Sequence, residues 1–302
     1  MQGEDDSEVA LADGRAVWLR GRRGTARAGH VVYVHGATFP SELSVFFRFD
    51  GRSWADALAE TGCSVWGFDF VGYGRSSRYP AHSIEPCGRS TEALPQLLAV
   101  LQRIRSLNGR RPVTLLAHSW GATVAARAAS DRPEWIDRLA LFGPIVRREM
   151  PIPSPPLPAL RPVNVWEQYR RFIEDVPRGH SSVLLDRHIE SWSRRYLASD
   201  PTSATRNPPS VLTPTGPMAD IQALWHGAAL YDAGRITQPL LVVRGEWDSL
   251  CTDADAVRLL REAASRVKRD AKIRAGTHLL HLEESRVELY RTVNEFLREP
   301  MD

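Results

Sequence analysis

Residues 113–123 read VTLLAHSWGAT, and this stretch decides the fold. The run at 113–117 is short and wholly apolar, which is typical of a strand buried on both faces of a parallel sheet. Ser119 follows at the turn into an expected helix, and the small residues Ala117 and Gly121 lie two positions to either side. A sharp strand-to-helix turn of this kind lifts a serine hydroxyl above the sheet. The alternative is an ordinary junction whose serine caps the helix.

The segments around this stretch alternate between strand and helix patterns. Strands are expected at 31–34, 65–68, 138–142, 239–243 and 271–275, and helices near 52–60, 94–104, 120–130, 253–266 and 287–297. Residues 6–20 are expected to form a hairpin around Asp13-Gly14, since that dipeptide tolerates the positive φ angles of a tight turn. Repeated alternation predicts an α/β fold, with a mostly parallel central sheet flanked by helices on both faces.

Two proline-rich stretches, at 150–163 and 201–217, interrupt the alternation. The first contains six prolines and is not expected to form an ordinary strand or helix. Between the two stretches, aromatic residues at helical spacing predict helices within 164–200. We therefore expect a helical cap or lid over the carboxyl edge of the sheet, where ligands bind in open α/β folds. The expected division is a core of 1–144 and 235–302 with a cap insertion at 145–234.

Composition excludes several other classes of protein. The 39 Lys and Arg residues nearly balance 36 Asp and Glu, which leaves a net charge of +3 without a dominant basic cluster, so we expect no nucleic-acid partner. The start, MQGEDDSEVA, lacks the pattern of a signal peptide, and no apolar run approaches the roughly 20 residues that cross a bilayer. The three cysteines have unrelated spacings and favour neither disulfides nor a metal site. A soluble cytoplasmic protein without cofactor or membrane partner is expected.

Several sequence segments together resemble the α/β-hydrolase family. The segment AHSWG is similar to its nucleophile elbow, G-x-S-x-G, with Ala117 in place of the first glycine. VVYVHGAT carries the His-Gly pair that follows an early strand in the family, and WGFDFVGYGRSSR resembles its D-x-x-G-x-G-x-S segment, with Asp69, Gly72, Gly74 and Ser76 matching. VVRGEWDSL and AGTHLLHLEE resemble its acid and histidine segments. These matches cover most of the chain outside the insertion.

The resemblance implies a catalytic triad of Ser119, Asp248 and His278, which follow one another in the family's order. A serine hydroxyl is a poor nucleophile until an imidazole removes its proton, and a carboxylate holds the tautomer of that imidazole. The implied oxyanion donors are the backbone N–H groups of Ala37 and Trp120.

Other residues compete for these roles. Glu246 is an alternative acid, and Asp248 is alternatively a cap of the helix near Asp253. His281 is interpreted as a packed or helix-start histidine, and His118 is interpreted as structural. Cys251 is interpreted as a small buried hydrophobe.

A serine nucleophile favours acyl chemistry on a carboxylic ester or thioester, and separates the chain from family branches whose nucleophile is Asp. A prolyl-iminopeptidase-like aminopeptidase is an alternative, although those enzymes carry H-G-G-P-G where this chain has HGATF at 35–39. An acyltransferase or a cofactor-free haloperoxidase could use the same triad. A catalytically silent ligand-binding protein on the same fold is the alternative outside enzymes.

The cap is expected to govern specificity for a small-molecule substrate. Candidate substrate-binding residues are His35, Trp166, Tyr169, Trp192 and Trp225, and Tyr196 is a further aromatic candidate. Arg170, Arg171, Arg194 and Arg195 are candidates for meeting an acidic substrate group. The alternatives are that His35 is structural, that the aromatic side chains form the core of the cap, and that the arginines form a solvated face.

Overall fold

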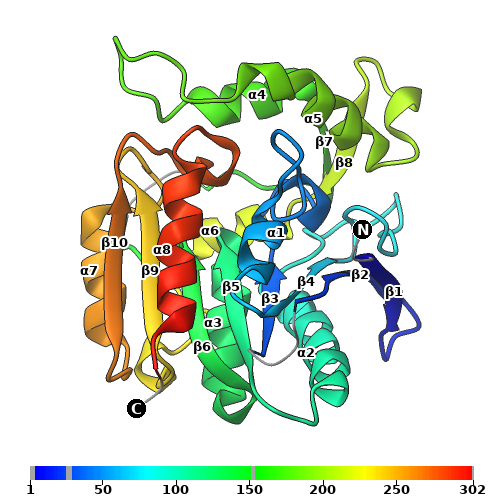
Figure 1. The fold of residues 1–302 in the computed structure, drawn as a ribbon. Helices are drawn as coiled ribbons and strands as arrows, with labels where there is room; N and C mark the ends of the chain where they lie inside the picture. The colour runs from blue at the N-terminus through cyan, green and yellow to red at the C-terminus, as the bar shows by residue number, and fades with distance from the viewer. Residues whose placement is uncertain (1–3, 25–28, 151–153, 301–302) are drawn as a thin grey trace.

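The computed structural model describes residues 4–24, 29–150 and 154–300, and in this part of the chain eight strands form one sheet (Figure 1). Their order is β1-β2-β4-β3-β5-β6-β9-β10. The strands are β1 (Glu4–Ala10), β2 (Ala16–Arg22), β3 (His30–Val34), β4 (Ser64–Asp69), β5 (Val113–His118), β6 (Ile136–Phe142), β9 (Leu240–Gly245) and β10 (Lys268–Ile273). The β1–β2 and β2–β4 pairs are antiparallel and the other pairs are parallel, which confirms the predicted sheet and its hairpin start.

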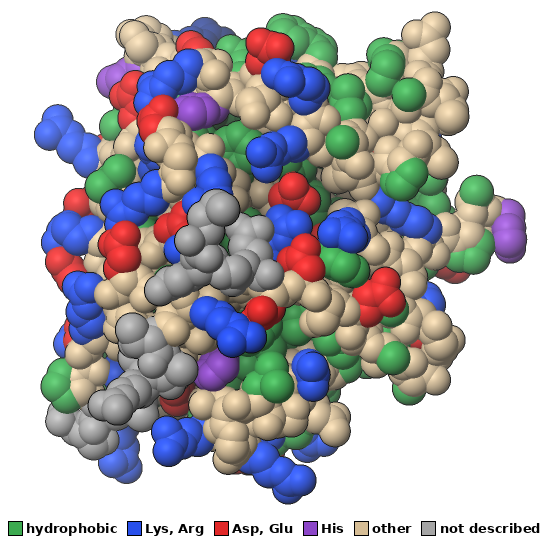
Figure 2. Space-filling model, turned by 45° about the vertical axis from the view of Figure 1, so that its right-hand side comes forward, with side chains coloured by type: hydrophobic (Ala, Val, Ile, Leu, Met, Phe, Trp, Pro, Cys, Tyr) green, Lys and Arg blue, Asp and Glu red, His purple; other side chains and the backbone are tan. Residues whose placement is uncertain are grey.

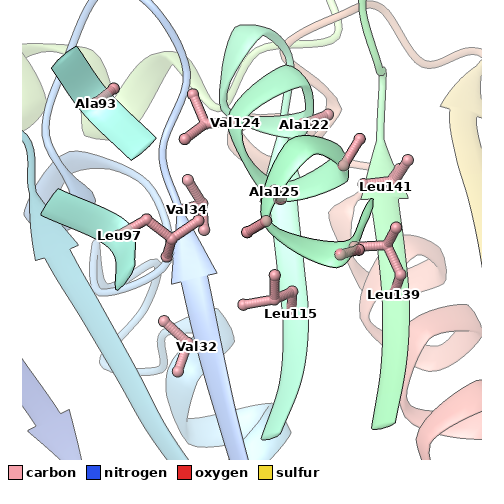
Figure 3. Close-up of a cluster of buried hydrophobic side chains, with 14 of the residues drawn as sticks. Val32, Val34, Ala93, Leu97, Leu115, Ala122, Val124, Ala125, Leu139 and Leu141 are labelled. Atoms are coloured by element: carbon pink, nitrogen blue, oxygen red, sulfur yellow. The ribbon is translucent and has the colours of Figure 1, made fainter. Parts of the chain in front are cut away.

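Helices cover both faces of this sheet. On one face lie α2 (Ser90–Leu107), α3 (Trp120–Asp131) and α7 (Asp253–Glu262), and on the other α1 (Trp54–Ala59) and α8 (Arg286–Arg298). Figure 3 shows Val34, Leu115 and Leu141 of three adjacent strands meeting Val124 and Ala125 of α3. All six residues of β5 are buried, because helices pack on both of its sides. The α7 helix is shorter than the expected 253–266.

The chain leaves this sheet between β6 and β9 and builds a separate layer. It contains α4 (Val165–Ile173), α5 (Asp186–Ala198) and a two-stranded antiparallel sheet of β7 (Leu160–Asn164) and β8 (Ser210–Pro214), followed by α6 (Gly216–Trp225). Figure 1 shows α4, α5, β7 and β8 above one end of the central sheet. Short 3₁₀ helices are η1 (Ser41–Leu43), η2 (Pro133–Trp135), η3 (Ser203–Thr205), η4 (Ala233–Arg235) and η5 (Leu280–Leu282).

The β7–β8 pair corrects the prediction that 150–163 forms no strand. Pro162 lies within β7 opposite Leu212 of β8. A proline lacks the N–H that a central strand needs, but it fits a strand with a neighbour on one side only. The layer of residues 154–214, called the cap below, therefore contains a small sheet where a helical insertion was expected, while α4 and α5 confirm helices within 164–200.

The cap is joined to the core by an aromatic cluster. Trp192 and Phe172 of the cap pack against Phe39 from the loop that follows β3, with ring centroids 5.3 and 6.1 Å from that of Phe39. The Trp192 indole donates to the carbonyl oxygen of Leu43 over 3.0 Å. By contrast, α6 packs on the core itself, since Ile221 and its neighbours join the cluster around α2 and α3.

On the face in Figure 2, Lys and Arg side chains lie interspersed with Asp and Glu. None of the helices that the described residues form is both long enough and apolar enough to cross a bilayer.

Candidate active site

Ser119 occupies a strained turn between β5 and α3. Its backbone has φ 57° and ψ −127°, in a region that L-residues rarely adopt. The turn is fixed by a 2.9 Å hydrogen bond from the Ser119 N–H to the Phe142 carbonyl oxygen. Gly121 follows where a Cβ atom would lie 2.3 Å from the His35 carbonyl oxygen, so a side chain does not fit there. Ala117, in contrast, lies within β5 and has no positive φ, so its Cβ atom is accommodated there.

Three side chains from separate segments form one hydrogen-bonded chain. Ser119 Oγ lies 2.8 Å from His278 Nε2, and His278 Nδ1 lies 3.0 Å from each oxygen of the Asp248 carboxylate. A carboxylate only accepts, so Nδ1 carries the proton and Nε2 is free to accept one from the Ser119 hydroxyl. Such an arrangement can activate a serine hydroxyl as a nucleophile.

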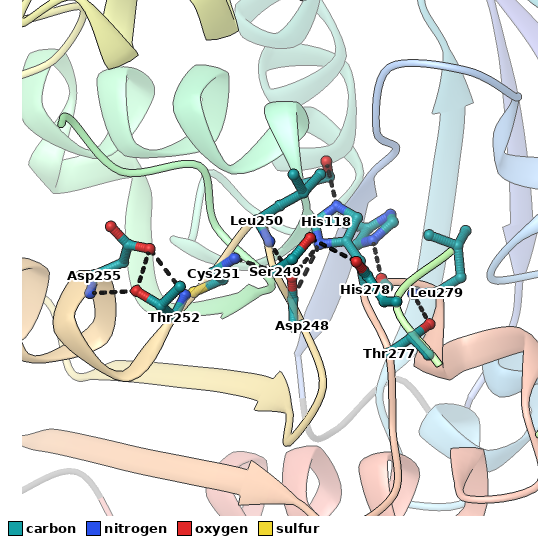
Figure 4. Close-up of polar contacts among 12 residues, drawn as sticks. His118, Asp248, Ser249, Leu250, Cys251, Thr252, Asp255, Thr277, His278 and Leu279 are labelled. Atoms are coloured by element: carbon teal, nitrogen blue, oxygen red, sulfur yellow. Dashed lines mark hydrogen bonds and ion pairs between the residues drawn. The ribbon is translucent and has the colours of Figure 1, made fainter. Parts of the chain in front are cut away.

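Backbone hydrogen bonds also hold the Asp248 carboxylate in place, as Figure 4 shows. The backbone N–H groups of Leu250 and Cys251 both donate to Asp248 Oδ1 over 2.9 Å. The side chains of Asp248 and His278 are almost fully buried. The carboxylate is therefore fixed in one orientation without competition from water.

The loops that carry Asp248 and His278 are in close backbone contact with each other. A Cβ atom on Gly245, at the end of β9, would lie 2.2 Å from the Gly276 carbonyl oxygen, and the Trp247 N–H donates to the same oxygen over 2.8 Å. Beyond Gly276, the Thr277 N–H donates to one oxygen of the buried Glu283 carboxyl group over 3.0 Å, and the Thr277 hydroxyl donates to the other. These contacts set the position from which the His278 ring reaches Ser119.

The loop after β3 runs beside the serine. His35 holds it, because its Nδ1 lies 2.7 Å from the Gly36 carbonyl oxygen while its Nε2 accepts the Phe70 N–H over 3.0 Å. Both ring nitrogens are thus engaged with backbone, and burial lowers the pKa of His35 to about 4. Ala37 lies two residues after His35 and, like Ser119, lines a cavity that is described below. The Trp120 N–H stands at the first position of α3, where it has no partner within its own helix.

The D-x-x-G-x-G-x-S segment, which begins at Asp69, forms hydrogen bonds with the chain that follows β3. Asp69 Oδ1 accepts the N–H and the hydroxyl of Ser41 over 2.9 and 2.7 Å. A Cβ atom on Gly74 would overlap the Asp69 carboxylate, at 2.0 Å from Oδ2. Burial raises the pKa of Asp69. The segment therefore shapes the backbone beside the site rather than reaching the serine.

The competing candidates lie elsewhere. Glu246 is exposed and its Oε2 accepts the Ala275 N–H over 3.0 Å, away from His278. Thr252, with Asp255, caps the start of α7. His281 is fully buried against Phe39. In residues 4–24, 29–150 and 154–300, no group of three or more His, Cys, Asp or Glu side chains is arranged to hold a metal ion.

His118 lies next to the hydrogen-bonded chain of Ser119, His278 and Asp248, which is called the relay below. The sequence indicated only a structural role for His118. Its Nε2 lies 3.0 Å from the His278 carbonyl oxygen, and its ring stacks on Phe142 with centroids 4.5 Å apart. It also lines the cavity. Burial lowers its pKa well below the ordinary value for histidine.

A cavity of about 410 Å³ opens onto Ser119 and His278. This volume lies within the range of small-molecule sites. Its apolar lining comprises Ala37, Phe39, Leu157, Val163, Pro214, Met218, Ile221, Trp225, Leu250 and Leu279, and Arg161, Arg171, Glu174 and three threonines add polar groups. The cavity thus lies between the sheet edge and the cap.

Of the predicted aromatic contacts, the structure brings only Trp225 into the described lining of this cavity. Trp192 and Tyr196 are buried in the aromatic cluster between cap and core. Trp166 is 64% exposed and stacks on Tyr169 outside the cavity. Helical spacing identified aromatic residues that pack, but it does not distinguish the side of a helix that faces a ligand.

Arg171 is the one arginine among the four sequence candidates in the described lining of the cavity. Sequence reasoning missed Arg161, Val163, Thr213 and Met218, which come from the two proline-rich stretches and the helix after them. The β-branched and apolar residues between those prolines are the signal in the sequence that could have identified them.

Comparison with solved structures gives the same architecture over nearly the whole chain. The chain is similar to a thioesterase domain from the curacin biosynthetic pathway (TM-score 0.66, 16% identity, covering 98% of this chain and 100% of that one). It is also similar to 2-hydroxy-6-oxo-6-phenylhexa-2,4-dienoate hydrolase from Rhodococcus sp. strain RHA1 (0.64, 17%, 98% and 100%) and to an epoxide hydrolase from Vigna radiata (0.62, 16%, 99% and 99%). At these identities the likeness concerns the fold alone.

No curated protein sequence matches the chain. The model of the alpha/beta hydrolase fold family matches residues 29–285, and the chain therefore belongs to that family.

Proposed function

We propose that the chain is a serine hydrolase that cleaves a carboxylic ester or thioester through an acyl-enzyme on Ser119. The observation that carries the proposal is the chain of hydrogen bonds from Asp248 through His278 to Ser119, whose hydroxyl end opens into a mostly apolar cavity. Family membership supports a hydrolase.

In the proposed first half-reaction, Ser119 Oγ attacks the substrate carbonyl carbon as His278 Nε2 takes the hydroxyl proton. The resulting oxyanion accepts hydrogen bonds from the N–H groups of Ala37 and Trp120, each worth about 10² to 10³ in rate by analogy with other oxyanion holes. Collapse breaks the bond to the leaving group, which receives the proton from His278. In the second half-reaction His278 takes a proton from water, the hydroxide attacks the acyl carbon, and Ser119 regains its hydrogen.

An active-site probe tests the proposal directly. A fluorophosphonate should phosphonylate the native chain once, at Ser119, and should not label Ser119→Ala. Ser249→Ala is the matched control, because this serine adjoins Asp248 but its Oγ donates to Asp175 and not to the relay. Labelling of Ser119→Ala at the native level would exclude the assignment.

A substrate panel then separates the alternatives. We expect hydrolysis of 4-nitrophenyl esters with a burst of nitrophenolate, or of acyl thioesters with release of the thiol. Turnover of proline amides in place of esters would identify an aminopeptidase. Ester binding without labelling or turnover would identify a silent ligand-binding protein.

A further inference from the structure

The charged groups of the cavity come from the cap. Arg161 lies on β7, and Arg171 and Glu174 lie on or next to α4. Most of the remaining lining is apolar. Charges beside an apolar cavity act on a ligand more strongly than charges in open solvent, because less water screens them.

The two arginines differ in their pairing. Arg171 Nη1 forms an ion pair with Glu174 Oε1, three residues along the chain, and its side chain is 24% exposed. Its charge is thereby offset within the cavity wall. Arg161 is an exposed residue and makes no ion pair or side-chain hydrogen bond to any residue in the described ranges, 4–24, 29–150 and 154–300.

The backbone of Arg161 is nevertheless fixed, although its side chain is exposed. It belongs to the β7–β8 pair, where it lies opposite Thr213, another cavity residue. Its neighbour two residues on, Val163, is buried and also lines the cavity. The guanidinium is therefore carried by a short, paired strand at the mouth of the cavity, and the wall has one positive charge in excess.

We propose that Arg161 is a specificity-determining residue that binds a carboxylate at the end of the substrate remote from the scissile carbonyl. This inference rests on the proposed esterase or thioesterase function. A guanidinium matches a carboxylate with two parallel N–H donors, and the pair is strongest next to apolar surface. The favoured substrates are thus apolar esters or thioesters that carry one terminal carboxylate, on either the acyl or the leaving portion.

Matched substrate pairs test the assignment. On the acyl side, mono-4-nitrophenyl suberate is compared with its neutral methyl ester. On the leaving-group side, 4-butyryloxybenzoate is compared with its neutral methyl ester. The measured quantity is the ratio of kcat/KM for the charged over the neutral substrate, and the pair with the larger ratio identifies which portion meets Arg161.

In the native chain we expect a ratio of roughly 5 to 10 for one pair, since the guanidinium is partly solvated. Arg161→Gln should reduce it to about 1, whereas Arg170→Gln, an exposed arginine of α4 outside the described lining, should keep the native ratio. Glu174→Gln should raise the ratio, because it releases Arg171. Salt should lower the native ratio but not that of Arg161→Gln.

If the native chain and Arg161→Gln give the same ratio, this inference is overturned. Hydrolysis of the neutral ester by both proteins would in that case still support the proposed esterase. Absence of both turnover and probe labelling would overturn the two together.

Discussion

Gly143 lies directly against the hydrogen-bonded pair of Asp248 and His278. A Cβ atom at this position would be 3.0 Å from both Asp248 Oδ2 and His278 Nδ1. Gly143 follows β6 with φ +52°, and its N–H donates to the Val243 carbonyl oxygen of β9 over 2.8 Å. The carboxylate and imidazole can thus approach one another because the neighbouring strand ends in a residue without a side chain.

Gly143→Ala should lower kcat roughly 10-fold, because the pair must shift by a few tenths of an ångström and small misplacements are costly in catalysis. Steady-state ester hydrolysis measures the effect. Gly51→Ala is the control, since Gly51 also has positive φ (+85°) but a Cβ atom there would meet nothing within 4 Å. Both variants should lose stability, and only the first should lose activity. Equal activities would contradict this account.

Asp248→Asn should lower kcat by about 10⁴-fold, by analogy with other triads, because an amide no longer fixes the proton on His278 Nδ1. Glu246→Gln, two residues away, should leave kcat within about 2-fold, as it touches the Ala275 N–H and not the imidazole. Single-turnover acylation with a 4-nitrophenyl ester distinguishes the two. A large loss in Glu246→Gln with a small loss in Asp248→Asn would reverse the assignment of the acid.

Strain at Ser119 predicts an inverted order of stabilities. Ser119→Gly should be more stable than Ser119→Ala by about 1 kcal/mol, because glycine accepts positive φ without a Cβ penalty. Arg127, in the interior of α3, provides the control, where glycine should instead be less stable than alanine by about 1 kcal/mol. Urea unfolding measures both pairs. The same order at the two positions would mean that the turn is unstrained.

The relay could be predicted from sequence because its members sit where strands end. Ser119, Asp248 and His278 each follow a strand or its adjoining turn, and parallel strands bring their carboxyl ends to one edge. The prolines around Arg161 were misleading, since they exclude a central strand but not a strand with one neighbour. The sequence also did not distinguish Trp225, which lines the cavity, from Trp192, which is buried in the cap cluster. That difference depends on the orientation of helices in three dimensions.

Glu283 should make stability fall with rising pH. Burial raises its pKa to about 7, so in the folded chain it keeps its proton while the unfolded chain, with an ordinary pKa near 4.5, releases it. Its contribution is full below pH 4.5 and is lost as pH rises to about 7. Glu283→Gln removes this dependence and keeps a partner for Thr277. Urea unfolding between pH 4.5 and 8 should show the native chain losing up to roughly 3 kcal/mol relative to the variant. Parallel profiles would contradict the prediction.

His281→Phe should stabilise the chain. His281 is fully buried between aromatic rings, and neither ring nitrogen has a hydrogen-bond partner in the described ranges. Removing two unpaired polar atoms is worth about 1 kcal/mol. Burial also lowers the pKa of His281 to about 3, so the native chain loses stability as pH falls below 6.5, and the gain from phenylalanine should be larger at pH 5 than at pH 8.

The matched variant is His118→Phe, which loses the contact of Nε2 with the His278 carbonyl oxygen and should therefore be destabilised. Thermal unfolding at the two pH values measures both variants. A destabilised His281→Phe would mean that its nitrogens are satisfied in solution, for instance by a buried water.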